Sequence, residues 1–158
     1  MKIRQARQAD RQAFYDMWLA FLQETSEDGR LLAPTRYNMS FFAHWYDQIL
    51  LGFKGGFVLF AEDDEGERVG VGFYAEDPPD SMQLTVARPI RCWGIWVDPK
   101  HRGKGISLKL QQEGIEEARR LGYLNYLGAF SRTKSRTKEL LDQGASIVES
   151  VILIPLGE

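Results

Sequence analysis

A basic, glycine-rich segment between an apolar run and a helical pattern constrains this chain more than any other feature. The segment reads Arg102-Gly103-Lys104-Gly105-Ile106-Ser107, and no acidic residue lies between Pro99 and Gln112. A helix start leaves backbone N–H groups unpaired at the positive end of the helix dipole, and glycines let the backbone approach an anion closely. The pattern predicts a phosphate or pyrophosphate site. The alternative is an ordinary glycine-containing loop with a solvated basic face.

The spacing of apolar residues predicts the elements around this segment. Helical spacing predicts helices over 11–24, from 41 to before Gly52, from 106 to a stop at Gly122, and over 134–143. Apolar runs and alternation predict strands over 1–6, 57–61, 69–75, 92–97, 123–130 and 145–156, the last bent at Ser150. The resulting order, β-α-α-β-β-β-α-β-α-β, is typical of a mixed α/β fold. It combines an antiparallel hairpin with a crossover that is compatible with parallel pairing.

Length, composition and charge limit the class of protein. With 158 residues, 44% hydrophobic and 27% charged, the chain is expected to form one domain over 1–158. It has no apolar run long enough to span a membrane and no signal-like N-terminal stretch, so we expect a cytoplasmic protein without membrane contact. Cys92 is the lone cysteine, and His44 and His101 lie in no ligand spacing, so we expect no metal. The net charge of −2 does not favour nucleic acid as a partner, whereas the net +3 over 91–158 favours an anionic ligand.

The glycine-rich segment resembles the signature of the GNAT superfamily of acetyl-CoA-dependent N-acetyltransferases. That signature is Arg/Gln-x-x-Gly-x-Gly/Ala, usually preceded by Val-x-Pro. Here Val97-Asp98-Pro99 precedes Arg102, and the one departure is Ser107 in the last position, which is still a small residue. The resemblance extends to the element order over nearly the whole chain. It implies an α/β fold with a GNAT-like mixed sheet whose central strands splay apart.

The resemblance also implies how acetyl-CoA would bind as cosubstrate. Backbone N–H groups of Arg102, Gly103, Lys104, Gly105, Ile106 and Ser107 would hold the pyrophosphate. Ile95, Trp96 and Val97 would lie on the splayed strand and pair with the pantetheine arm through backbone groups. The basic stretch at 132–138 would lie near the adenosine end, where it either meets the 3′-phosphate or forms a solvated helix face.

The groups that catalyse transfer are less clearly marked. Many family members carry a Glu on the central strand and a Tyr in the last helix, and here those positions hold Arg91 and Leu140 or Leu141. Replacement candidates are Tyr126, Tyr74 and Glu76, with Tyr123 and Cys92 as further ones. The alternatives are sheet-packing tyrosines with hydroxyls at the rim, a surface position for Glu76, and a small buried hydrophobe at Cys92. A cation at Arg91 can hold a carboxylate or phosphate of the acceptor.

These features predict an N-acetyltransferase that moves an acetyl group from acetyl-CoA to an amine of a small molecule, peptide or protein by direct attack on the thioester. The alternative is a non-catalytic GNAT-fold module that binds CoA or a protein partner. A nucleic-acid or structural accessory protein with an unrelated use of the basic turn is a third hypothesis. Aromatic residues at 41–53 form either part of the acceptor wall or core. The strand over 145–156 makes a homodimer possible by pairing across subunits.

Overall fold

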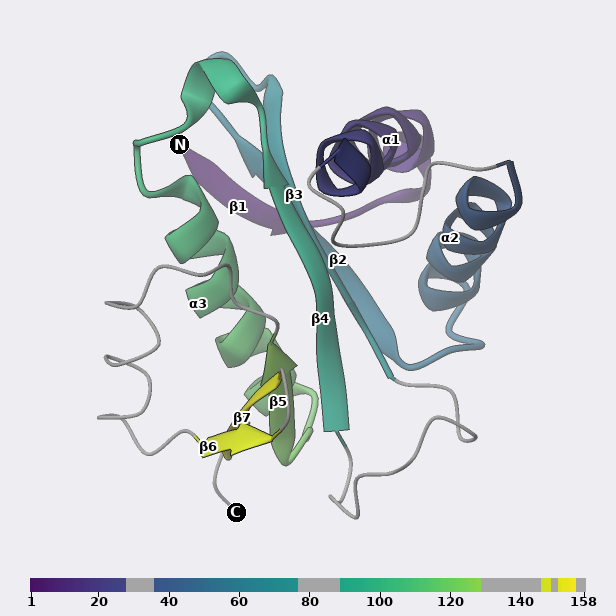
Figure 1. The fold of residues 1–158 in the computed structure, drawn as a ribbon, viewed down its shortest axis with the longest axis vertical. Coiled ribbons are helices and arrows are strands. Elements are labelled where there is room, and N and C mark those ends of the chain that lie inside the picture. Colours follow the sequence, from purple (N-terminus) through teal and green to yellow (C-terminus); the bar gives the residue numbers. More distant parts are fainter. Residues whose placement is uncertain (28–35, 77–88, 129–145, 149–150, 156–158) are drawn as a thin grey trace.

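A twisted sheet of seven strands organises the protein. The computed structural model describes residues 1–27, 36–76, 89–128, 146–148 and 151–155 (Figure 1). The strand order is β1-β2-β3-β4-β5-β7-β6, and all described neighbours pair antiparallel except β4 and β5, which are parallel. The mixed α/β fold that the sequence predicts is confirmed.

The described elements follow the predicted order closely. The strands are β1 (Lys2–Gln5), β2 (Gly56–Glu62), β3 (Arg68–Ala75), β4 (Pro89–Val97), β5 (Asn125–Gly128), β6 (Ser146–Val148) and β7 (Val151–Pro155). The helices are α1 (Arg11–Glu27), α2 (Arg36–Leu50) and α3 (Ile106–Arg120), with short 3₁₀ turns η1 (Gln8–Asp10) and η3 (Pro99–His101). No helix in these described ranges is both long and apolar enough to cross a membrane. The predicted helix over 134–143 and the connection over 77–88 lie outside the described residues.

Helices cover both faces of the sheet, so the strands have two buried sides. Helices α1 and α2 lie on one face and α3 on the other (Figure 1). The alternation of a strand sends successive side chains to opposite faces. In β2, Val58 and Phe60 pack on the face of α1 and α2, whereas Phe57 and Leu59 pack on the face of α3. This double burial explains why the strands read as nearly continuous apolar runs.

Strand β4 contains a bulge at Trp93. Phe73 pairs with Gly94 and Tyr74 pairs with Cys92, so Trp93 is the extra residue on β4. Strand β5 pairs with β4 only from Pro89 to Cys92, while β4 continues to Val97. A bulge bends its strand and increases the local twist. The predicted splay between the central strands is therefore confirmed, and in the described part of the chain residues 93–97 of β4 have no strand beside them on the β5 side.

The terminal segment differs from the prediction of one strand over 145–156 bent at Ser150. It contains two strands, and Val148 pairs antiparallel with Val151 while β7 also pairs with β5. The segment 145–156 lacks the Asn-Gly or Asp-Gly pair that marks a tight hairpin, so the apolar residues on each side of Glu149-Ser150 predict one continuous strand. Pairing of this segment across a homodimer stays a prediction.

A buried charge network ties the N-terminal strand to the hairpin of β2 and β3. Asp10 is 1% exposed and accepts hydrogen bonds from both terminal nitrogens of Arg4, at 2.7 and 3.0 Å, and from Arg68 at 2.5 and 2.8 Å. Its carboxylate also accepts from the Arg7 backbone N–H, and Arg4 donates in turn to Glu62. The Arg4 hydrogen bonds are the largest cause that holds the pKa of Asp10 well below its usual range. The network fixes β1 and the start of α1 against β2 and β3.

Candidate functional site

A pocket of about 360 Å³ opens where the end of β4, the turn after it and α1 meet. Eight of the nine residues predicted for cofactor binding line it, and Lys104 lies between them in the exposed part of the turn. Helix α1 adds residues that the sequence did not point to, and His101 also contributes. The lining residues are Phe21, Glu24, Thr25, Ile95, Trp96, Val97, His101, Arg102, Gly103, Gly105, Ile106 and Ser107.

The turn between β4 and α3 has a left-handed backbone conformation at two positions, which glycine adopts more easily than other residues. Gly103 and Gly105 have φ angles of +79° and +74°, in the left-handed region, and a Cβ built on either would meet no atom within 4 Å. Conformation, not crowding, therefore favours glycine at these positions. Gly105 is the N-cap of α3 and has no side chain to occupy the first N–H groups of the helix. Gly105, Ile106 and Ser107 line the pocket, so the start of α3 suits an anion there.

The Arg102 side chain holds the turn in place. Its Nε donates to the Val97 carbonyl at 2.9 Å, and one terminal nitrogen donates to both carboxylate oxygens of Glu24 at 2.7 Å. Trp96 also donates its indole N–H to Glu24 at 3.1 Å. Glu24 on α1 thus links helix, strand and turn around the pocket. No sequence signal marks Glu24, because it lies 78 residues from Arg102.

Among the described residues, the β5 side of β4 has no strand partner at 93–97, and this edge leads from the pocket toward the centre of the sheet. Residues 93–97 extend over about 16 Å at the usual rise per residue of a strand. Ile95 packs toward the face of α3 and Trp96 toward the face of α1. The edge therefore offers backbone N–H and C=O groups to a linear ligand, and side-chain identity matters little for such pairing.

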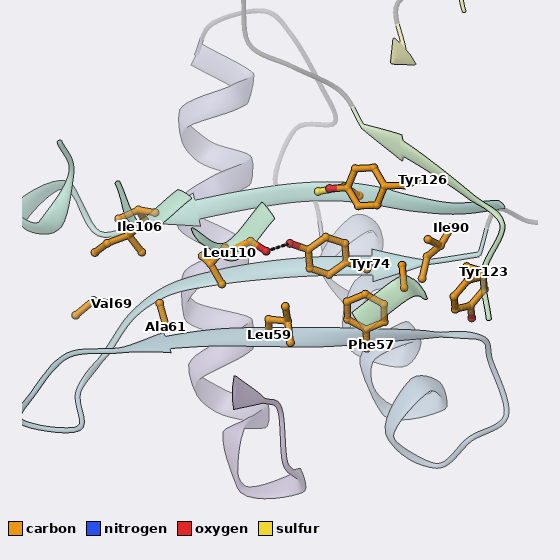
Figure 2. Close-up of a cluster of buried hydrophobic side chains, with 13 residues drawn as sticks. Phe57, Leu59, Ala61, Val69, Tyr74, Ile90, Ile106, Leu110, Tyr123 and Tyr126 are labelled. Carbon is orange, nitrogen blue, oxygen red and sulfur yellow. Dashed lines mark hydrogen bonds between the residues drawn. The ribbon is translucent and has the colours of Figure 1, made fainter. Parts of the chain in front are cut away.

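Tyr126 of β5 and Cys92 of β4 lie close together where the two strands pair. Tyr126 is 1% exposed, and its hydroxyl hydrogen-bonds with the Cys92 thiol. Burial raises the pKa of Cys92 to about 11, with the Tyr126 hydrogen bond acting in the opposite direction. Cys92 is therefore a neutral thiol near pH 7, which supports its interpretation as a small buried hydrophobe. Tyr126 lies on the face of α3, beside Tyr74 (Figure 2).

The environment of the Tyr74 side chain indicates a role in packing the sheet against α3. It is completely buried, and its hydroxyl donates to the Leu110 carbonyl on α3 at 2.7 Å (Figure 2). Burial raises its pKa well above the ordinary value. A Cβ on Gly72 or on Gly114 would come within 2.7 Å of the Tyr74 ring or hydroxyl, so both glycines make room for this side chain. The expectation of a rim hydroxyl is wrong for Tyr74, because the side chain bridges the sheet and α3.

Glu76 is exposed at the end of β3. Its backbone N–H donates to the Gly55 carbonyl at 3.1 Å, and its carboxylate lies directly beside the Gly55 Cα. Gly55 immediately precedes β2, so this carboxylate lies on the β2 side of β3, while β4 lies on the other side. The arrangement agrees with the surface interpretation of Glu76. Among the described residues, no group of three or more His, Cys, Asp or Glu side chains has the arrangement of a metal site.

The face of α1 and α2 carries the aromatic residues predicted as acceptor wall or core. Phe42, Trp45 and Tyr46 are buried, with Tyr46 donating its hydroxyl to the Arg7 carbonyl at 2.7 Å. Phe41 is half-buried, and Phe53 is 77% exposed. Buried members of this set form core, as predicted for about half of them. Trp93 of β4 packs against Trp45 and Phe42, so the aromatic cluster reaches the bulge in β4.

Known proteins resemble this arrangement. The acetyltransferase (GNAT) family model matches residues 11–138. YncA of Salmonella typhimurium, solved with its cofactor acetyl-CoA, is 20% identical with a TM-score of 0.71, over 100% of this chain and 95% of that chain. A phosphinothricin acetyltransferase from Sinorhizobium meliloti, in complex with acetyl-CoA, is 19% identical with a TM-score of 0.71, over 99% and 89%. A ribosomal-protein-alanine N-acetyltransferase from Brucella melitensis is 21% identical with a TM-score of 0.68, over 97% and 96%. Among curated proteins no sequence matches. At identities this low, the structural similarity shows a shared fold alone.

Proposed function

Because this chain belongs to the GNAT acetyltransferase family, we propose that it transfers an acetyl group from acetyl-CoA to an amine of a small molecule, peptide or protein. The observation that carries the proposal is the continuity of the pocket at 102–107 with the unpaired edge of β4. Acetyl-CoA has an anionic pyrophosphate and an extended pantetheine arm. The start of α3 suits the pyrophosphate, and the edge at 93–97 suits the arm. The acetyl-CoA complexes of the Salmonella and Sinorhizobium proteins support the same ligand.

Each part of the site has a distinct task in this proposal. Backbone N–H groups of the turn and of the first residues of α3 bind the pyrophosphate, while Arg102 and Glu24 hold the turn against β4 and α1. Backbone groups of Ile95, Trp96 and Val97 orient the pantetheine arm. This places the thioester near the bulge at Trp93, where β4 and β5 converge. Holding the two reactants in this geometry supplies much of the rate enhancement.

The chemical step is direct attack of a neutral amine on the thioester carbonyl. A C–N bond forms, the C–S bond breaks, the amine proton passes to water, and the departing CoA thiolate takes up a proton. We propose that Tyr126 lends its hydroxyl proton to that thiolate, since its hydroxyl reaches Cys92, the last residue of β4 that pairs with β5. Tyr74 and Glu76 have environments that favour structural and surface roles, so neither is assigned to the step.

Substitution of Tyr126 by phenylalanine is expected to lower kcat by about 100-fold, the usual size of an acid–base contribution. The dissociation constant for acetyl-CoA should change by less than about twofold, because the hydroxyl acts on the leaving group and not on binding. Single-turnover rates and calorimetry measure the two quantities. Tyr74→Phe is the matched control: it removes a buried hydrogen bond to Leu110, so it should lower stability and leave kcat unchanged. An unchanged kcat in Tyr126→Phe would exclude Tyr126 from the step.

The proposed activity is tested by measuring CoA release from acetyl-CoA with a panel of acceptors. The panel contains small amines, amino acids and peptides with free N-termini, because the similar proteins are a phosphinothricin acetyltransferase from Sinorhizobium and a ribosomal-protein-alanine N-acetyltransferase from Brucella. Amine-dependent CoA release, with the acetylated amine found by mass spectrometry, supports the proposal. Saturable CoA binding without turnover on the whole panel would contradict it and favour a non-catalytic module.

A further inference from the structure

We propose that the acceptor is an amine that also carries a carboxylate, and that Arg91 is the residue that selects it. This inference rests on the proposed function. It is carried by the position of Arg91 at the convergence of β4 and β5 and by the aromatic cluster beside it. The cluster consists of Phe41, Phe42, Trp45 and Trp93.

Arg91 lies one residue before the last pair between β4 and β5, and it pairs with Leu127 on β5 and Ala75 on β3. The unpaired edge that leads from the cofactor pocket begins two residues later, at Trp93. An arm that follows this edge from 97 toward 93 therefore ends about 7 Å from the Arg91 backbone, at the usual rise of two strand residues. An acceptor that reaches the end of the arm must approach Arg91.

The Arg91 side chain lies on the face of α1 and α2. Its guanidinium carbon is 5.7 Å from the centroid of the Trp93 ring, and Trp93 packs on Trp45 with a centroid distance of 4.8 Å. Cys92 and Tyr126 lie on the opposite face. The acceptor and the proton donor of the proposed reaction would therefore approach the thioester from opposite faces of the sheet, at the point where pairing between β4 and β5 ends.

A second cation, the Lys54 ammonium, contacts the same aromatic cluster. The Lys54 ammonium lies 4.2 Å from the centroid of the Trp45 ring, so Arg91 and Lys54 flank the Trp93 and Trp45 pair. Positive charge next to aromatic surface suits an acceptor with an anionic group and an apolar part, and it disfavours a purely cationic amine. The planar guanidinium forms two parallel hydrogen bonds with a carboxylate, whereas an ammonium acts as a point charge.

The same cation helps to explain how an amine reacts here without a carboxylate base at this position. A positive charge near an ammonium group favours loss of its proton, and neutral amine is the form that attacks. A carboxylate on the acceptor pairs with Arg91 and offsets the repulsion that would otherwise keep the amine away. Arg91 therefore binds one end of the acceptor and favours the reactive form of the other.

Matched acceptors test the selection. L-phenylalanine is compared with 2-phenylethylamine, L-leucine with 3-methylbutylamine, and O-phosphoethanolamine with ethanolamine, with rates expressed per neutral amine. For the wild-type protein we expect kcat/KM to be about 100-fold higher for the carboxylate-bearing member of the first two pairs, a range typical of a hydrogen-bonded charge pair. A larger preference in the phosphate pair would assign the anion as phosphate and overturn the carboxylate.

Variants at Arg91 connect that preference to the residue. Arg91→Gln should reduce the kcat/KM preference for the carboxylate-bearing acceptor to within about threefold, mainly through KM. It should also raise the apparent pKa in the pH profile of kcat. Arg91→Lys should keep an intermediate preference, because it retains the charge and loses the paired geometry. Acetyl-CoA affinity serves as the control for folding. A preference that survives unchanged in a folded Arg91→Gln protein would overturn the assignment.

Binding of products separates this inference from the proposed activity. N-acetyl-L-phenylalanine and N-acetyl-2-phenylethylamine are titrated into the CoA-saturated protein and into Arg91→Gln. Binding that needs both the carboxylate and Arg91 would support the inference even if no acceptor turns over, in which case the proposed activity alone fails. Equal binding of the two products, or no binding of either, would overturn the inference whether or not amines are acetylated.

Discussion

Substitution of Gly105 by aspartate is expected to weaken acetyl-CoA binding by at least about 100-fold. Gly105 is the N-cap of α3, so the new carboxylate would occupy the N–H groups proposed to hold the pyrophosphate. Two like charges about 4 Å apart near a protein surface repel by about 4 kcal/mol, and every 1.4 kcal/mol corresponds to a factor of ten. The measurement is the rise in melting temperature with saturating acetyl-CoA, which the wild type should have and the variant should lack.

The matched control for this substitution is Gly105→Asn. Asparagine has the same shape as aspartate, tolerates a positive φ similarly and carries no charge, and a Cβ at this position meets no atom within 4 Å. Both variants should therefore fold, with a loss of about 1–2 kcal/mol from the left-handed backbone. If the aspartate variant still gained the full wild-type shift with acetyl-CoA, the turn would not be the pyrophosphate site.

Removal of the Asp10 side chain should have the largest effect on stability. Asp10→Ala would leave Arg4 and Arg68 beside an empty buried position, and breaking a buried ion pair in this way usually costs about 3–5 kcal/mol of unfolding free energy. Urea unfolding at pH 7 measures the loss. An effect below 1 kcal/mol would mean that the network contributes little.

The pH dependence of stability gives an independent check of the same network. Hydrogen bonds from Arg4 lower the pKa of Asp10 in the folded state. A carboxyl group with a depressed folded pKa stabilises the fold above its unfolded pKa of about 3.9, and this stabilisation is lost as the pH falls further. The stability difference between wild type and Asp10→Asn should therefore be largest near neutral pH and should shrink below about pH 4. Parallel stability curves from pH 7 to pH 3 would contradict this account.

The strand, turn and helix that build the pocket after β4 could be predicted because their signals are local. An apolar run over 92–97, glycines at 103 and 105, and apolar or small residues every four positions in α3 each specify their own element. The splay of β4 and β5 followed from the family resemblance. These features sufficed to find eight of the nine predicted cofactor residues around one pocket.

Features that depend on contacts far apart in the sequence could not be predicted. Glu24 meets Arg102 only after α1 has packed beside the end of β4. Tyr74 alternates like any strand residue, and its hydroxyl is buried only because α3 packs closely on β3, with Gly114 of α3 and Gly72 of β3 leaving room for the ring. The bulge at Trp93 changes which face each residue of β4 presents, and a continuous apolar run carries no mark of it.

We propose that the turn at 102–107 and the edge of β4 form an acetyl-CoA site. The most direct test is a calorimetric titration of acetyl-CoA into the purified protein. The account predicts saturable binding with one molecule per chain, and the same titration into Gly105→Asp should give no measurable heat of binding. Absence of binding to the wild-type protein at millimolar acetyl-CoA would contradict the account and would mean that the chain has the fold of the family without its cosubstrate.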